Sequence, residues 1–188
     1  GDVAGPKLLE HLVDAVLLLE GDRTHDLRLL RTMKNRFGPT DEVGVFEMSE
    51  RGLVPVVNPS ARFLDGRAAD VPGSAVVATL EGTRAILVEL QALAQPTNFG
   101  YPKRTASGFD VNRLQLLLAV LEQRATIPAS RYDVYLNVVG GVKLKEPAAD
   151  LAVCLAVASA IKQIPIPSNL AVWGEVGLSG EIRKVSVA

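Results

Sequence analysis

The sequence predicts an α/β protein in two parts, a short run of strands followed by a larger domain of strands and helices. Apolar and polar residues alternate with a period of two over Arg84–Ala94, which is typical of a strand. After Asp110 the apolar residues recur at helical spacing. Between the two parts, Asp65–Gly73 mixes charges with Gly and Pro and has no apolar period, as expected of a linker.

The composition restricts the functions that the chain can have. With 188 residues and 48% hydrophobic content, it can bury a sizeable core. Its 20 basic and 21 acidic residues leave a net charge of -1, so a nucleic-acid contact requires a local basic patch. The single cysteine, Cys154, excludes an internal disulfide and favours a buried thiol in a reducing compartment. Because no apolar run reaches transmembrane length, we expect a cytoplasmic protein without a membrane partner.

Residues 1–64 predict one short helix and several strands. The expected elements are a helix over Pro6–Leu12, a buried strand over Ala15–Leu19, an exposed strand from Leu27 to Lys34, a strand over Val43–Met48, and a strand over Val54–Val57 after a turn at Gly52. These few elements cannot form an independent hydrophobic core, so we expect them to be the end of a larger domain. The only histidines, His11 and His25, have no third ligand beside them, and we expect no metal site.

A cationic turn is the first candidate site. Lys34-Asn35-Arg36-Phe37-Gly38 places two cations around an amide, before a bend at Gly38-Pro39. Phe37 is expected to anchor the bend with its apolar ring. Such a corner can present both charges to a phosphate, and it can equally be a solvated basic turn.

Residues 74–188 predict a layer of helices on a sheet. The expected elements are a hairpin of Ser74–Leu80 and Arg84–Ala94, a loop over Gln95–Gly108, a helix capped by Asp110 and ending near Arg124, a strand over Tyr132–Val138, a helix from Pro147 to about Lys162, and strands over Leu170–Val176 and Ile182–Val185. In the loop, Lys103 and Arg104 lie near Phe99 and Tyr101, a combination that binds single-stranded DNA. An ordinary solvated loop is the alternative.

The first 64 residues contain four motifs: Glu20-Gly21-Asp22, Lys34-Asn35-Arg36-Phe37-Gly38, Glu42-x-Gly44-Val45-Phe46-Glu47-Met48 and Asn58-Pro59-Ser60. Together they resemble the bacterial RadA (Sms) recombination and repair family. The resemblance implies that these residues are the last strands of a RecA-like ATPase core. It also implies that Lys34 and Arg36 act in trans on the nucleotide of a neighbouring subunit, as an arginine finger does.

Three motifs stand out in residues 74–188: Asn137–Gly141, Glu146–Ala152 and Gly174-x-x-Gly177-x-x-Gly180-Glu181. Through them this region resembles the proteolytic domain of Lon proteases, as the C-terminal domain of RadA does. The resemblance implies a Lon protease-like α/β domain, truncated at its C-terminus, whose partner lysine would lie past Ala188. The position of the nucleophilic serine is Ala148, which has no hydroxyl, so the domain is expected to be proteolytically inactive.

The family implies a function for the intact protein. It would be a hexameric, ATP- and Mg-dependent motor on single-stranded DNA and branched intermediates, promoting branch migration together with a RecA-type recombinase. No GxxxxGK[ST] phosphate loop occurs in this chain, so we expect no ATPase activity and no cofactor within the fragment itself. The phosphate loop and a zinc finger are expected upstream of Gly1. The Lon-like domain would serve hexamer assembly and DNA binding; alternatively, it is only a protein-binding or oligomerisation module.

Overall fold

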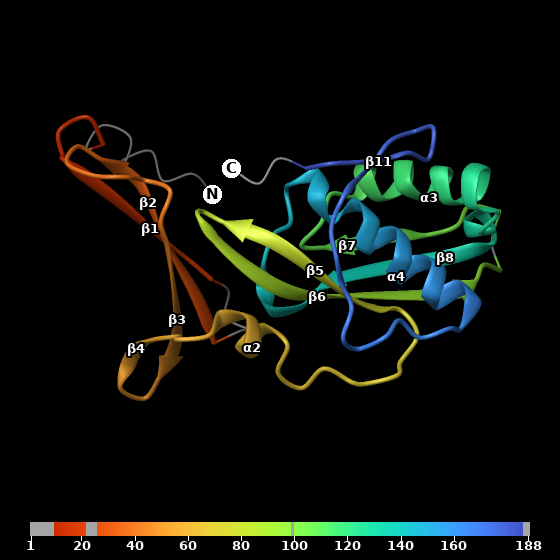
Figure 1. The fold of residues 1–188 in the computed structure, drawn as a ribbon, viewed down its shortest axis with the longest axis horizontal. Coiled ribbons are helices and arrows are strands. Elements are labelled where there is room, and N and C mark those ends of the chain that lie inside the picture. Colours follow the sequence, from red (N-terminus) through yellow and green to blue (C-terminus); the bar gives the residue numbers. More distant parts are fainter. Residues whose placement is uncertain (1–9, 22–25, 99, 186–188) are drawn as a thin grey trace. The chain divides into compact units, whose positions relative to one another are not determined.

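A computed structural model describes residues 10–21, 26–98 and 100–185, which form two compact units (Figure 1). Unit 1 comprises Gly1–Pro59 and Leu80–Ala85, and unit 2 comprises Ser60–Thr79 and Ile86–Ala188. Both units contain strands and unit 2 adds helices, so the predicted α/β class is confirmed. The finer assignment, to the end of a RecA-like core and a Lon-like domain, stays a prediction.

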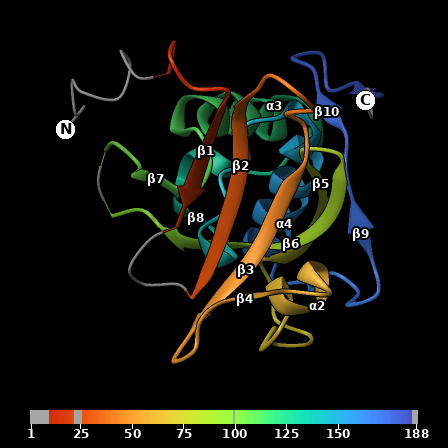
Figure 2. The same cartoon turned by 90° about the vertical axis from the view of Figure 1, so that its left-hand side faces the viewer.

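Unit 1 contains a four-stranded antiparallel sheet in the order β1-β2-β3-β4 (Figure 2). Its strands are β1 (Ala15–Glu20), β2 (Leu27–Asn35), β3 (Val43–Ser49) and β4 (Gly52–Pro55). Four strands were expected here, and β4 begins at the predicted turn residue, Gly52, which has a positive φ of 94°. Of the predicted helix over residues 6–12, only Glu10–Leu12 lie within the described residues, and they form a turn.

The predicted burial of the first strand is wrong. Leu17, Leu18 and Leu19 are 61%, 40% and 46% exposed. Strand β1 is an edge strand, and the described part of unit 1 contains no helix to cover its apolar side chains. The apolar run therefore predicted the strand correctly, but it did not predict whether other residues would cover its side chains.

Unit 2 is built on a five-stranded mixed sheet in the order β7-β8-β6-β5-β9. Its strands are β5 (Ser74–Glu81), β6 (Arg84–Pro96), β7 (Arg104–Ser107), β8 (Tyr132–Val138) and β9 (Ala171–Val172). Strands β5 and β6 form the predicted hairpin. Strand β8 pairs antiparallel with β6 and parallel with β7. Apolar residues of the sheet form much of the buried core, with Val88, Leu90 and Val134 fully inaccessible.

Helices α3 (Val111–Ala125) and α4 (Asp150–Lys162) pack against each other beside this sheet (Figure 1). Asp110 caps α3 as predicted, because its Oδ1 accepts a hydrogen bond from the Arg113 amide at 2.7 Å. Helix α4 is buried on almost every side, as its apolar sequence indicates. Its predicted first turn differs, since Pro147–Ala149 form a 3₁₀ turn (η3) ahead of the α-helix.

Shorter elements complete unit 2. They are α2 (Pro59–Phe63), the 3₁₀ turns η1 (Ala129–Arg131) and η2 (Val139–Gly141), and the paired strands β10 (Glu175–Val176) and β11 (Ile182–Arg183).

Two predicted elements need correction. The expected loop over residues 95–108 contains β7, a four-residue strand. The expected strand over residues 170–176 is divided into β9 and β10 at Gly174, whose backbone bonds to Ala148 and Leu151 instead of to the sheet.

The predicted linker, residues 65–73, lies within unit 2. Arg67 is largely buried there, and its guanidinium donates to the Ser74 hydroxyl at 3.0 Å and to the Ser168 carbonyl at 3.0 Å. Gly73 donates its amide to the hydroxyl of Ser159 in α4 at 2.9 Å. These contacts fasten the segment to the second unit; the predicted domain limits of 1–64 and 74–188 stay predictions.

Candidate functional site

The Lys34–Gly38 motif forms an exposed turn at the end of β2. The Lys34 ammonium donates to the carbonyls of Glu10 at 2.7 Å and Val13 at 2.8 Å. Asn35 closes the turn with both ends of its amide, because its Oδ1 accepts from the Phe37 N–H at 3.2 Å and its Nδ2 donates to the Pro39 carbonyl at 3.3 Å. Lys34 thus holds the preceding segment against the strand, while Asn35 shapes the bend.

Arg36 and Phe37 form the outward part of this turn. The Arg36 guanidinium lies 3.2 Å from the Asp14 carboxylate and 5.9 Å from the centroid of the Phe37 ring. Both charged side chains are largely exposed, at 72% for Arg36 and 57% for Asp14, so their ion pair is weak and easily exchanged. The prediction that Phe37 anchors the bend is wrong, since its side chain is 81% exposed. The turn offers one cation and one aromatic ring to whatever contacts it.

Arg31, three residues before Lys34, is the centre of a charged cluster. Its Nε donates to Glu20 at 2.5 Å, and its Nη2 forms an ion pair with Glu81 in the tip of the β5–β6 hairpin. Burial lowers the pKa of Arg31, but the hydrogen bonds that its guanidinium donates to Glu20 and Glu81, with the charges of these two carboxylates, outweigh burial and leave the pKa raised. This cluster could not be predicted from the sequence, because Arg31 and Glu81 are 50 positions apart.

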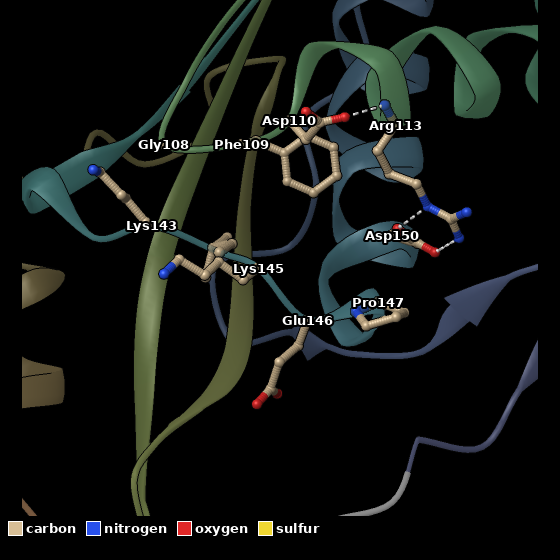
Figure 3. A pocket seen from close by; sticks show the side chains of 10 residues that line it. Gly108, Phe109, Asp110, Arg113, Lys143, Lys145, Glu146, Pro147 and Asp150 are labelled. Carbon is tan, nitrogen blue, oxygen red and sulfur yellow. Dashed lines mark hydrogen bonds and ion pairs between the residues drawn. The ribbon is translucent and has the colours of Figure 1, made fainter. Parts of the chain in front are cut away.

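The second candidate site lies at the start of α4. A pocket of about 520 Å³ is lined by the beginning of α3 and by the segment that leads into η3 (Figure 3). Its lining residues are Gly108, Phe109, Asp110, Arg113, Lys143, Leu144, Lys145, Glu146, Pro147 and Asp150. Figure 3 shows the Arg113 side chain reaching from α3 to Asp150, while Lys143 and Lys145 project from the opposite wall.

Asp150 is completely buried and fully engaged. It accepts hydrogen bonds from Arg113 Nε at 3.0 Å, from Arg113 Nη2 and from the Val176 amide at 3.1 Å. The hydrogen bond to Asp150 raises the pKa of Arg113 despite partial burial, so the guanidinium stays charged. The negative charge of Asp150 in the first turn of α4 is therefore neutralised by Arg113 of α3.

Ala148, the predicted position of a degenerate nucleophile, lies beside this pair in η3. Its side chain is 7% exposed, and its carbonyl accepts a hydrogen bond from the Gly174 amide at 2.8 Å. A methyl group cannot attack a carbonyl, so position 148 supports no acyl-enzyme chemistry. Gly177 and Gly180 belong to the Gly174-x-x-Gly177-x-x-Gly180 motif, and they lie in the turn between β10 and β11.

The structure separates the roles of Lys103 and Arg104. The Arg104 guanidinium donates to the carbonyls of Tyr132 and of Ala129, the latter at 2.9 Å, and burial lowers its pKa. The backbone N–H of Lys103 donates a hydrogen bond to the Asp133 carboxylate at 2.8 Å. Tyr101 is 91% exposed, whereas Phe99 lies outside the described residues. Arg104 thus supports the fold through its side chain, and DNA binding by either residue stays a prediction.

The remaining reactive side chains form no site within the described residues. Cys154 is buried in α4, and burial raises the pKa of its thiol to about 12, so it is protonated at neutral pH. His11 is exposed in the turn before β1, and His25 lies outside the described ranges. Across residues 10–21, 26–98 and 100–185, no three His, Cys, Asp or Glu side chains gather as metal ligands. In the same ranges, no helix has both the length and the apolar character needed to span a bilayer.

Known proteins similar to this chain are bacterial DNA repair proteins. They carry the name DNA repair protein RadA, and those of Halalkalibacterium halodurans, Bacillus subtilis and Streptococcus pneumoniae are each 54% identical to this chain over 186 residues, 99% of its length. The resemblance to the RadA family predicted from the motifs is therefore confirmed. The chain spans only 41% of the length of the first two relatives and 44% of the third. No family model matches the chain.

Proposed function

We propose that this chain is part of an ATP-driven DNA motor that promotes branch migration and processes recombination intermediates during DNA repair. The observation that carries the proposal is the 54% identity, over 99% of the chain, to proteins named DNA repair protein RadA. The exposed cationic turn at the end of β2 supports it, because phosphoryl transfer needs a cation that reaches the transferred group.

In this proposal Arg36 acts on the nucleotide of a neighbouring subunit. Its guanidinium is exposed and held only by a surface ion pair with Asp14, so it can exchange that carboxylate for a phosphate oxygen. Lys34 is the second proposed cation. Because two backbone carbonyls already accept hydrogen bonds from its ammonium, its contribution includes holding residues 10–13 beside the turn. Phe37 would pack against the neighbouring subunit and shield the ion contact from water.

The proposed cofactors and partners follow from the same assignment. ATP and Mg would be bound by residues outside this chain, since the chain itself has no phosphate loop. A zinc finger would also lie outside it. The proposed partners are further copies of the protein in a hexamer, single-stranded and branched DNA, and a RecA-type recombinase.

We assign unit 2 to assembly of the hexamer, with DNA contact as a second role. Exposed apolar side chains near the β10–β11 pair support an assembly role: Trp173, Leu178 and Ile182 are 54%, 66% and 62% exposed. The methyl group of Ala148 argues against peptidase activity by a serine at that position. The same exposed side chains also favour the alternative that unit 2 is solely a protein-binding or oligomerisation module.

The test is DNA-stimulated ATP turnover by the full-length protein that contains this chain. Arg36→Ala should lower turnover by about 10³-fold or more if the guanidinium stabilises transition-state charge. Lys34→Ala should also lower turnover, and it should loosen residues 10–13. Arg51→Ala is the matched control, because Arg51 is an exposed arginine in a different turn of the same sheet. Wild-type turnover by Arg36→Ala in assembled protein would refute the role given to Arg36. If the unchanged full-length protein shows no DNA-stimulated turnover, the motor assignment fails and the oligomerisation module is favoured.

A further inference from the structure

The tip of the β5–β6 hairpin contacts both flanks of the Lys34–Gly38 turn. On the upstream side, Glu81 forms an ion pair with Arg31, three residues before Lys34. On the downstream side, the Thr83 amide donates to the Asp41 carbonyl at 2.9 Å, three residues after Gly38. The tip, Leu80–Ala85, belongs to the same compact unit as the turn.

The upstream contact is a shielded one. The Glu81 side chain is only 7% exposed, and that of Arg31 is 29% exposed. A carboxylate this deeply buried depends on its cation, whereas Arg31 retains a second partner in Glu20. Loss of Glu81 would therefore release the tip from Arg31 and leave the β1–β2 pairing intact.

The downstream contact depends on a glycine. Gly82 has a positive φ of 63°, and a Cβ at this position would lie 1.9 Å from the Asp41 carbonyl oxygen. No side chain larger than hydrogen fits there without moving the tip away from the loop. The hairpin thus touches Asp41 through backbone alone, which gives a short and rigid contact.

We propose that the hairpin tip is a positioning element for the motif turn, with Glu81 and Gly82 fixing its two flanks. This inference rests on the proposed function, in which Arg36 must reach a neighbouring nucleotide. Strands β5 and β6 continue from the tip into the five-stranded sheet of unit 2.

Two variants of the full-length protein test the inference by independent routes. Glu81→Ala removes the ion pair, and Gly82→Ala forces the tip away from Asp41. Each should raise amide hydrogen exchange in residues 32–42 by about tenfold or more, because the turn opens more often. Exchange in β3 and β4 should stay unchanged. The turnover number of the DNA-stimulated ATPase should fall with little change in KM for ATP, since a displaced Arg36 weakens only transition-state contacts.

The chain provides a control for each variant. Arg84→Gln changes an exposed charge at the same tip. Gly52→Ala changes a glycine of positive φ, 94°, that has no neighbouring atom within 4 Å. Neither control should change exchange in residues 32–42.

The outcomes separate this inference from the proposed function. Unchanged exchange in residues 32–42 of Glu81→Ala and Gly82→Ala would overturn the positioning role, whatever the ATPase assay gives. Faster exchange with an unchanged turnover number would overturn it too, because the turn would not need to be held. If Arg36→Ala keeps wild-type turnover while exchange rises in the tip variants, the contact is real and the role proposed for Arg36 is wrong.

Discussion

The ion pair between Arg113 and Asp150 gives a sharp prediction about the stability of unit 2. Asp150 is 0% exposed, and Arg113 supplies two of its hydrogen bonds. Arg113→Met keeps the length of the side chain but leaves a buried carboxylate without a cation. Breaking a buried pair in this way costs about 3–5 kcal/mol. Asp150→Asn should cost less, about 1–3 kcal/mol, because Arg113 is 31% exposed and can regain water.

The double variant tests this reasoning. Arg113→Met combined with Asp150→Asn leaves no uncompensated charge, so it should be more stable than Arg113→Met alone. Urea unfolding of the 188-residue chain, followed by the fluorescence of Trp173, measures the free energy of unfolding. Trp173 is the only tryptophan in the sequence and belongs to unit 2, so its signal reports that unit.

An exposed ion pair provides the control. Arg183→Met disrupts a contact with Glu181, and the Arg183 side chain is 61% exposed, so no comparable loss is expected. If Arg113→Met is no more destabilising than Arg183→Met, or if the double variant is the least stable of the set, the pair does not carry the stability assigned to it.

Three further predictions concern charged side chains. Hydrogen bonds from the Ser130 hydroxyl and amide lower the pKa of Glu122, so the ionised carboxylate stabilises the fold at neutral pH, and this contribution is lost as the pH falls through the lowered pKa. The stability deficit of Glu122→Gln should therefore be largest near pH 7 and disappear at acid pH in urea titrations, and a deficit independent of pH would contradict this origin. Lys103→Ala should weaken DNA binding by the full-length protein and reduce its salt slope by about one if the ammonium contacts a phosphate. Arg104→Ala should instead lower thermal stability, because the carbonyls of Ala129 and Tyr132 lose their donor; unchanged affinity and salt slope in Lys103→Ala would exclude its phosphate contact.

Elements with strong local signals could be predicted from the sequence. The start of α3 could be predicted because Asp110 is followed by apolar residues at helical spacing. The Asp110 carboxylate accepts the hydrogen bond from the Arg113 amide that is expected of an N-cap. The period of two in β6 and the turn at Gly82 likewise predicted the hairpin. In each case the deciding interactions lie within a few residues of one another, where spacing carries information.

Features that depend on distant partners could not be predicted. Strand β7 has only four residues and pairs with β8. A segment this short has no alternation of apolar and polar residues from which a strand could be predicted. Leu17 is exposed because no helix in the described part of unit 1 covers β1. The cationic turn could be recognised from its residues. Its contacts with the hairpin tip, the Arg31–Glu81 ion pair and the hydrogen bond to Asp41, could not be predicted because the tip is distant in sequence.

The division of the chain into units has a consequence for how the protein can be cut. The chain passes between the units at Pro59–Ser60, Thr79–Leu80 and Ala85–Ile86. A protease that nicks residues 65–73 would therefore leave the two products joined, because the Leu80–Ala85 tip stays bound to Arg31 and Asp41. Truncation at the same place would remove from each half a partner that it needs. Cleavage of a peptide bond within residues 65–73 is thus not sufficient to separate the two products.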